Sequence, residues 1–415
     1  MPIEKIDIVM FSMSEYGEWQ SGIVNRNFYV LHTLLQDPRV RKVVTIDYLP
    51  FTWKRAARQW FQNVMRGVDG KVVSRGLFHK LTAVRESEIE RTGFSLAGFE
   101  PTAVPYRLFC YSDVRSVFSE YVVYRQLQHD LKRLDLKNVV LWSYVPTFVR
   151  YFGKFGEELT VFDAVDNWLE HSSYAGVRER ITLNYQTIRY KADLIFTTSQ
   201  DLVNFFDRPT GCTFVPNGAA LSHIEQVPKL VDREVANLPR PIIGYVGTMQ
   251  EDRIDIDLIA YLAKANPTKS FVLVGPVWPG LKQEVEIKLK QLPNVVLTGR
   301  KSFIEARMYI REFAVAIVPY LQNDFNRHAN PMKVYEYLAA GKPVVATPGP
   351  GLEVLRGAIR LAATPEAFND QLLKALDEVS PQDVERRMTV AREHSWEARV
   401  NSMLDNVFRV LNERG

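Results

Sequence analysis

The chain has 415 residues, of which 46% are apolar and 24% are charged, and its formal net charge is +4. This length predicts two domains, and this composition is typical of a globular protein in water. No run of residues approaches the roughly eighteen apolar positions of a membrane span, and the N-terminus lacks the basic-then-apolar order of a signal peptide, so we expect a cytoplasmic protein.

Cysteine usage and charge narrow the possible classes further. Cys110 and Cys212 are too few for a disulfide framework or a metal cluster, which suits a reducing compartment. The mild positive charge neither requires nor excludes an anionic partner. We expect no nucleic-acid partner.

Two series of apolar strands alternate with helix-length segments along the chain. Strands that are apolar throughout and separated in this way indicate parallel sheets covered on both faces. Two series predict an α/β protein with two doubly wound, Rossmann-like domains. The expected strands are 6–11, 43–49, 139–144, 161–165, 194–198 and 213–216 in the first series, and 242–246, 271–274, 295–297, 315–319, 344–346 and 359–362 in the second.

The domain boundaries follow from these series. We expect a first domain at 1–218, a linker at 219–240, a second domain at 241–380 and a helical tail at 381–415. The linker contains Pro228 and Pro239 and has no strong apolar period. Because ligands of open parallel sheets lie beyond the carboxyl ends of the strands, substrate should bind in the cleft between the domains.

Residues 51–110 form an insertion that is too long for a plain connection between two strands. Apolar residues recur there at helical spacing, and residues 51–91 hold nine Lys or Arg against four Asp or Glu. A basic amphipathic helix with tryptophans Trp53 and Trp60 is typical of an interfacial membrane element. The alternative is a helix whose apolar face packs on the sheet. The apolar positions are Trp53, Ala56, Ala57, Trp60, Phe61, Val64, Met65 and Val68.

The strand at 161–165 leads into two carboxylates, Asp163 and Asp166. Asp166 falls at the carboxyl end and faces the predicted cleft, whereas strand alternation puts Asp163 on the opposite side. A carboxylate in such a place can act as a general base that takes a proton from a hydroxyl group, and Asp166 is our candidate. A structural aspartate that caps the next turn is the alternative.

Residues 330–341 read as a short helix closed at both ends. Asn330 is expected as the N-cap, Pro331 as the first helical residue and Gly341 as the left-handed residue past the end. Lys333 lies in the first turn, where free N–H groups and the helix dipole favour an anion. Glu336 follows one turn later on the same face, so this helix predicts a sugar-phosphate site. An exposed Lys–Glu pair on an ordinary surface helix is the alternative.

The run 331–347, P-M-K-x-Y-E-Y-L-A-x-G-K-P-V-V-A-T, resembles the donor-site signature of GT-B glycosyltransferases. It is most similar to bacterial enzymes of exopolysaccharide and teichuronic acid assembly, including xanthan-type glucuronosyltransferases. The resemblance implies the GT-B fold, with the C-terminal helix crossing back onto the first domain. In the retaining branch two glutamates stand eight positions apart. Glu336 matches the second, but His328 stands at the first, so inverting and retaining outcomes both stay open.

The resemblance also implies a set of site residues. The loop at Gly247, Thr248 and Arg253 would lie beside the diphosphate, and the turn at Arg300 and Lys301 beside the nucleobase. The donor would further contact Tyr320, Met332, Lys333, Glu336 and the glycine-rich turn with Gly349. Asp166 matches the base position of the glucuronosyltransferase-like group, and the loop 12–22, with Trp19 and Gly22, would line the acceptor side.

Together these features predict a glycosyltransferase of cell-surface polysaccharide synthesis. It would move a sugar from a nucleotide-sugar donor, expected to be UDP-linked, to a lipid-linked or polysaccharide acceptor, while bound peripherally to the inner face of the membrane. We expect no metal and no cofactor, because helix N–H groups, Lys333 and Arg253 can stabilise the leaving diphosphate. Two alternatives remain: a sugar-nucleotide 2-epimerase of the same fold, and a non-catalytic partner that binds nucleotide sugar or glycan.

Overall fold

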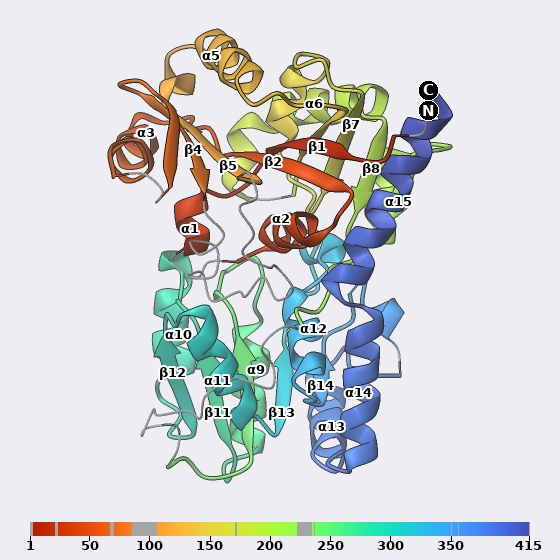
Figure 1. The fold of residues 1–415 in the computed structure, drawn as a ribbon. Coiled ribbons are helices and arrows are strands. Elements are labelled where there is room, and N and C mark those ends of the chain that lie inside the picture. Colours follow the sequence, from red (N-terminus) through yellow and green to blue (C-terminus); the bar gives the residue numbers. More distant parts are fainter. Residues whose placement is uncertain are drawn as a thin grey trace.

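The structure is a computed structural model that describes residues 3–20, 24–66, 70–84, 106–170, 172–221, 235, 237–349, 351–355 and 357–414. Two sheets lie one above the other, and each is covered by helices (Figure 1). Each sheet has its own apolar core. This is the predicted α/β architecture of two doubly wound domains.

The first sheet has nine strands in the order β3-β4-β5-β2-β1-β6-β7-β8-β9. All neighbours are parallel except β3–β4 and β4–β5, which are antiparallel. The central strands are buried along their whole length, as their apolar sequences predicted. The strands are β1 (Ile6–Phe11), β2 (Val40–Ile46), β3 (Lys71–Arg75), β4 (His79–Val84), β5 (Leu108–Asp113), β6 (Val139–Ser143), β7 (Leu159–Ala164), β8 (Leu194–Thr197) and β9 (Cys212–Phe214).

The helices of this half lie between the strands in chain order. Asn25 caps α2, because its side-chain oxygen accepts a hydrogen bond from the backbone N–H of Phe28 at 3.4 Å. The helices are α1 (Tyr16–Gln20), α2 (Arg26–Gln36), α3 (Trp53–Gln59), the π-helix η1 (Trp60–Arg66), η2 (Arg115–Val117), α5 (Glu120–Lys132), η3 (Pro146–Tyr151), η4 (Ser172–Val177), α6 (Arg178–Lys191) and α7 (Gln200–Phe206).

The second sheet has six parallel strands in the order β12-β11-β10-β13-β14-β15. Its strands are β10 (Ile242–Val246), β11 (Ser270–Val274), β12 (Val295–Gly299), β13 (Val315–Val318), β14 (Val344–Ala346) and β15 (Arg360–Leu361). Its helices are α9 (Ile256–Ala265), η5 (Pro279–Leu281), α10 (Lys282–Lys288), α11 (Phe303–Glu312), η6 (Asn326–His328), α12 (Met332–Ala339), η7 (Glu353–Leu355) and α13 (Pro365–Ala375).

The C-terminal tail crosses back to the first domain, as predicted. Helix α14 (Pro381–Glu393) packs against α12, and α15 (Trp396–Arg414) packs against α2 (Figure 1). The ring of Trp396 stacks on that of Tyr29 with centroids 5.1 Å apart. At the crossing, Ala219 and Ser395 pair as a short bridge. The N–H of Ala219 donates to the carbonyl of His394 at 2.8 Å, and the N–H of Trp396 donates to the carbonyl of Ala219 at 3.0 Å.

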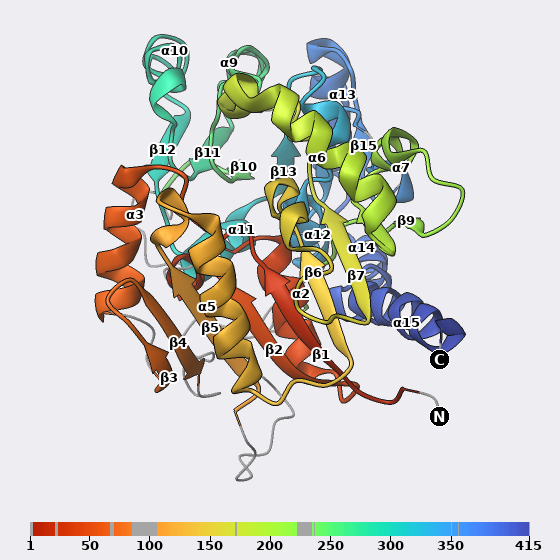
Figure 2. The same cartoon turned by 90° about the horizontal axis from the view of Figure 1, so that it is seen from above.

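The insertion at 51–110 differs from the single basic helix that we expected. Helix α3 gives way to a π-helix, η1, and the chain then adds the antiparallel strands β3 and β4 to one edge of the first sheet (Figure 2). Ala56 and Gln59 are buried, so part of the predicted apolar face packs inward. Val68 and residues 85–105 lie outside the described residues.

A chain of buried polar contacts joins the two domains. The Nε of Arg26 on α2 donates to both carboxylate oxygens of Asp163 on β7, at 3.0 and 3.1 Å, and both side chains are fully buried. Its Nη1 donates to the Oδ1 of Asn217 at 3.1 Å. The Nδ2 of Asn217 then donates to the carbonyl of Asn330 at 2.6 Å. The first domain is thereby tied to the start of α12.

The helix start at 330–332 differs from the sequence expectation, because Pro331 stands at the N-cap and is not the first helical residue. Asn330 does not cap α12, which begins at Met332. Its side-chain Oδ1 instead accepts from the N–H of Asn217, and its Nδ2 donates to the carbonyl of Gly351, both at 2.7 Å. The other end of the helix is as predicted. Gly341 has φ of 68°, and the N–H of Lys342 donates to the carbonyl of Tyr337 at 2.9 Å.

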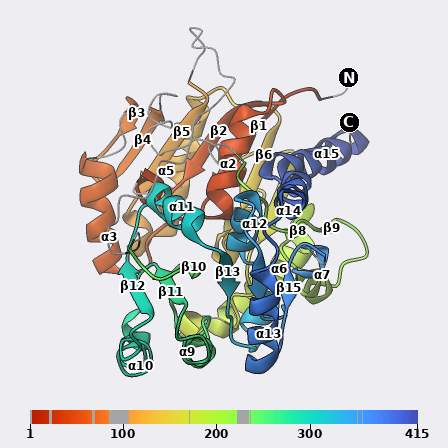
Figure 3. The same cartoon turned by 90° about the horizontal axis from the view of Figure 1, so that it is seen from below.

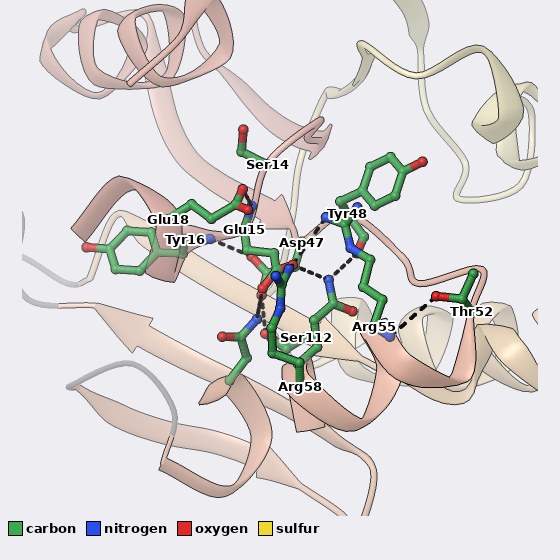
Figure 4. A network of polar contacts seen from close by, with 12 residues as sticks. Ser14, Glu15, Tyr16, Glu18, Asp47, Tyr48, Thr52, Arg55, Arg58 and Ser112 are labelled. Carbon is green, nitrogen blue, oxygen red and sulfur yellow. Dashed lines mark hydrogen bonds and ion pairs between the residues drawn. The ribbon is translucent and has the colours of Figure 1, made fainter. Parts of the chain in front are cut away.

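A second buried network fixes the loop after β1 (Figure 4). The carboxylate of Asp47 accepts hydrogen bonds from the N–H of Tyr16 at 2.8 Å, from the Nδ2 of Asn63 at 3.2 Å and from the Ser112 hydroxyl. The carboxylate of Glu15 meets Arg55 at 3.2 Å. Helix α3 and π-helix η1 are therefore anchored to this loop by buried acids.

Breaking the buried ion pair should destabilise the whole chain. In Arg26→Met the Asp163 carboxylate stays buried without its cation, which costs about 3–5 kcal/mol of unfolding free energy. Denaturant unfolding monitored by tryptophan fluorescence measures this loss. The double variant Arg26→Met/Asp163→Asn should regain much of it, because the uncompensated charge is gone. Equal stability of Arg26→Met and wild type would contradict this role.

Asp47 should make stability depend on pH. Burial raises its pKa to about 7, against the hydrogen bonds from Ser112 and Tyr16. Stability that comes from the protonated carboxyl is fully present below the unfolded pKa of about 4 and is lost as pH rises through about 7. Between these values the unfolding free energy should fall by on the order of 1 kcal/mol per pH unit relative to Asp47→Asn.

Thermal and denaturant unfolding at several pH values would check this slope. The exposed Asp370→Asn serves as the matched control and should keep the wild-type pH dependence. A wild-type slope in Asp47→Asn would show that another group titrates.

Candidate active site

A cleft of about 430 Å³ lies between the two domains at the carboxyl ends of β7, β10 and β11. Most of the predicted site residues line it from one wall or the other. Those that do so are Asp166, Gly247, Thr248, Arg253, Arg300, Lys301, Tyr320, Met332, Lys333 and Glu336.

Two predicted residues lie elsewhere. Gly349 lines a smaller neighbouring cavity of about 150 Å³, which shares Tyr320 and Pro331 with the cleft. Trp19 is fully buried in the core of the first domain, where its ring meets those of Tyr16 and Phe28. Trp19 therefore packs beneath the loop that follows β1, and it does not line the cleft. Gly22 lies outside the described residues.

Two cations flank one tyrosine on the wall of the second domain. The Nζ of Lys333, in the first turn of α12, donates to the Tyr320 hydroxyl and lies 4.8 Å from its ring centroid. The guanidinium of Arg253 lies 5.6 Å from the same centroid. Burial raises the pKa of Tyr320, but Lys333 and Arg253 outweigh burial and the net shift is downward. The cluster therefore concentrates positive charge beside the N-terminus of α12.

A glycine makes room for this cluster. Gly247 ends β10 with φ of 148°, a region that favours glycine. A Cβ there would lie 3.0 Å from the Cε of Lys333 and 3.0 Å from the hydroxyl of Tyr245. The resemblance implied that Gly247 lies beside the diphosphate, and the structure shows that the side chain of Lys333 needs the space that this glycine leaves.

Glu336 lies deeper in the cleft and contacts the other domain. Its Oε1 accepts a hydrogen bond from the hydroxyl of Tyr29 on α2 at 3.1 Å. Burial raises the pKa of Glu336, although Arg307, Tyr29 and Lys333 oppose this shift. Glu336, which was expected to contact the donor, is therefore held by a side chain of the first domain.

Asp166 lies on the opposite wall, two residues past the end of β7. Its backbone carbonyl accepts a hydrogen bond from the hydroxyl of Tyr185 at 3.2 Å, which fixes the turn. Asp163 is buried in the pair with Arg26 and does not line the cleft, so the two carboxylates separate as strand alternation predicted. Burial lowers the pKa of Arg253, but Tyr320 and the charge of Asp166 across the cleft outweigh burial and raise it.

The turn that follows β12 also reaches the cleft. Ser302 caps α11 and forms a capping box with Glu305. Arg300 is exposed, and the Nζ of Lys301 lies 5.2 Å from the ring centroid of Tyr309. Both residues line the rim of the cleft.

Several lining residues were not predicted from the sequence. Among them are basic and amide side chains whose partners are distant along the chain, so no local motif marks them. Arg307 acts on Glu336 and lies 4.3 Å from the ring of Phe303. Gly275 has φ of 140°, and a Cβ there would lie 2.1 Å from the carbonyl oxygen of Gly247. The additional lining residues include Asn25, Arg26, Asn217, Gly275, Arg307 and Asn330.

His328, which stands at the position of the first glutamate, ends η6 and is not among the residues that line the cleft. Within the described residues no group of three His, Cys, Asp or Glu side chains could hold a metal ion. A search of the same residues finds no helix with the length and apolar character needed to span a membrane.

Comparison with known proteins places this cleft in context. Residues 240–378 match a family described as "Glycosyl transferases group 1". The chain is 27% identical over 220 residues to a putative teichuronic acid biosynthesis glycosyltransferase, TuaH, of Bacillus subtilis strain 168. That match covers 50% of this chain and 55% of the relative, so the chain spans about half of the curated relative's length.

Solved structures match over nearly the whole chain. Sucrose-phosphate synthase from Thermosynechococcus elongatus has a TM-score of 0.64 at 16% identity, covering 99% of this chain and 100% of that one. HepE of Anabaena, in complex with UDP and glucose, has a TM-score of 0.62 at 12% identity, covering 97% and 99%. At these identities the likeness concerns the fold. The chain has the GT-B fold, its residues 240–378 are similar to group 1 glycosyltransferases, and the chain is similar to a putative glycosyltransferase of teichuronic acid biosynthesis.

Proposed function

We propose that this protein transfers a sugar from a UDP-linked donor to a lipid-linked or polysaccharide acceptor in cell-surface polysaccharide synthesis. The observation that carries the proposal is the polarity of the cleft. Lys333, Arg253 and Glu336 line the wall of the second domain, and Asp166 lines the wall of the first. The teichuronic acid relative and the UDP complex of HepE support the choice of acceptor class and nucleotide.

The second-domain wall suits the leaving nucleoside diphosphate. Lys333 and Arg253 lie on either side of Tyr320, and the free N–H groups at the start of α12 add a positive dipole end. Preorganised charge of this kind stabilises a departing anion without reorganisation. We propose that these groups carry the charge of the diphosphate and that no metal is needed. Glu336 would accept hydrogen bonds from the ribose hydroxyls.

The first-domain wall suits the acceptor. We propose that Asp166 takes the proton from the acceptor hydroxyl. The hydroxyl oxygen of the acceptor then bonds to the anomeric carbon as the bond from that carbon to the nucleoside diphosphate breaks. Such a displacement inverts the anomeric configuration. The protein would work on the cytoplasmic face of the membrane, where a lipid-linked acceptor is held.

Removing the base should stop transfer while leaving donor binding intact. Asp166→Asn should lower the transfer rate by about 10²–10⁴-fold, the usual contribution of a general base. A discontinuous assay of UDP release with acceptor measures the rate, and calorimetry measures UDP affinity. Asp370→Asn, an exposed carboxylate on α13, is the control. Unchanged transfer would eliminate the base assignment.

The same assay separates the alternatives. An inverted anomer in the product, read by NMR, is expected. A retained anomer would instead make Asp166 an orienting group for the donor sugar. Turnover of UDP-sugar at C2 without acceptor would identify an epimerase, and donor binding with no turnover would identify a non-catalytic partner.

Glu336→Ala should weaken nucleotide binding, because the ribose loses its acceptor. A loss of about tenfold corresponds to roughly 1.4 kcal/mol, which is the size of one hydrogen bond to a charged group. Thermal stabilisation by a series of nucleotides measures this. Tyr29→Phe is the matched control, since it removes the hydrogen bond to Glu336 but keeps the carboxylate. Wild-type affinity in Glu336→Ala would end the ribose assignment.

Gly247→Ala should also weaken UDP binding, by about tenfold or more, because its Cβ would press on Lys333 at a strained φ. Calorimetry with UDP is the measurement. Gly176→Ala has no atom within 4 Å of its Cβ and should bind UDP normally. Normal binding by Gly247→Ala would show that Lys333 can be displaced without cost.

A further inference from the structure

An unusual cluster of exposed rings lies at the edge of the first domain, away from the cleft. The ring centroid of Phe118 lies 4.4 Å from that of Trp53 and 6.5 Å from that of Phe78. Trp53 and Phe118 are each 62% exposed, and Leu77, next to Phe78, is 67% exposed. We call these four residues the ring patch. Contiguous exposed apolar surface of this kind marks an interaction site.

Three separate elements build the ring patch. Trp53 begins α3, Leu77 and Phe78 form the turn between β3 and β4, and Phe118 follows η2. These elements lie together at one edge of the first sheet (Figures 2 and 3). The sequence pattern had pointed to the helix alone. Phe61 and Met65 on η1 are also exposed.

The ring patch is held in place from below. The Nε1 of Trp60 donates to the carbonyl of Leu77 at 2.7 Å, which pins the hairpin turn to η1. Ala56, Val64 and Val114 form a small separate core beneath α3 and η1. The elements that carry the rings are therefore well packed, and the rings are exposed although their backbone is held in place.

Exposed basic side chains lie on α3 and β3, the elements that carry or adjoin the ring patch, and one of them, Arg58, also pairs with Glu15. Lys54, Arg58, Lys71 and Arg75 are exposed on the same elements. Residues 51–66 and 70–84 contain no aspartate or glutamate. Rings with a rim of cations suit the headgroup region of an anionic bilayer, where aromatic side chains insert and basic ones pair with phosphates.

We propose that the ring patch docks this protein on an anionic lipid bilayer. This proposal deepens the proposed function. It rests on that function only for the idea that the acceptor is lipid-linked. Helix α3, which presents Trp53, also places Arg55 against Glu15 in the loop after β1 (Figure 4). Docking would therefore bring the bilayer against the acceptor-binding domain and leave the nucleotide wall in water.

Vesicle co-sedimentation of the full chain tests the proposal. Wild type should bind phosphatidylcholine vesicles that contain phosphatidylglycerol. Trp53→Ser/Phe118→Ser should lose about tenfold or more in affinity, because the inserted apolar area is gone. Tyr190→Ser removes an 82% exposed ring on α6 and should bind like wild type. Lys54→Glu/Lys71→Glu should lose binding mainly to the anionic vesicles and at low salt.

Two readouts keep this result separate from the transfer reaction. UDP affinity, measured by calorimetry, and circular dichroism of the double serine variant should match wild type, which shows a folded protein with an intact donor site. Wild-type vesicle binding by Trp53→Ser/Phe118→Ser would overturn the proposal. So would light scattering that shows a dimer of wild type that this variant abolishes, since the ring patch would then bind a second copy.

Discussion

The arrangement of the two domains depends on a polar chain that begins at one buried guanidinium of the first domain. Arg26 lies on α2, pairs with Asp163 on β7 and bonds Asn217 just before the chain leaves the first domain. A buried charge is tolerated only when its partners are fixed, so the high desolvation cost enforces a single geometry. Because Asp163 is three residues before Asp166, the same pair sets where the candidate base lies. The polar chain continues to Asn330, beside the start of α12.

The cleft that results has a cationic cluster on the wall of the second domain and the candidate base on the wall of the first. On the second domain, Lys333 and Arg253 share Tyr320, and glycine at 247 leaves space for the lysine. On the first domain, Asp166 follows a fully buried strand. A nucleotide sugar has its negative charge on the diphosphate and its reactive carbon next to it. We therefore propose that the cationic cluster and Asp166 serve the two ends of a single displacement.

The sequence was informative where a single element determines its own structure. Apolar strands, the Ser302 cap and the left-handed Gly341 follow from local patterns, and the structure shows all of them. It was uninformative where partners lie far apart, as for Arg26 and Asp163, which are 137 positions apart. Strands β3 to β5 were missed because basic and helical signals dominate their surroundings. Asn330 has the residue type of a cap but is used by the neighbouring domain.

The two points where the chain crosses between the domains have a mechanical consequence. Residues Ala219 and Ser395 pair through main-chain hydrogen bonds, and the backbone of Trp396 would lie 2.9 Å from a Cβ placed at Gly218. The segment that leaves the first domain and the segment that returns to it are therefore joined at this bridge. A single linker permits twisting about its own length, whereas a paired crossing resists torsion and leaves bending as its soft motion. Any opening of the cleft would follow one arc, and the walls would meet again in the same register.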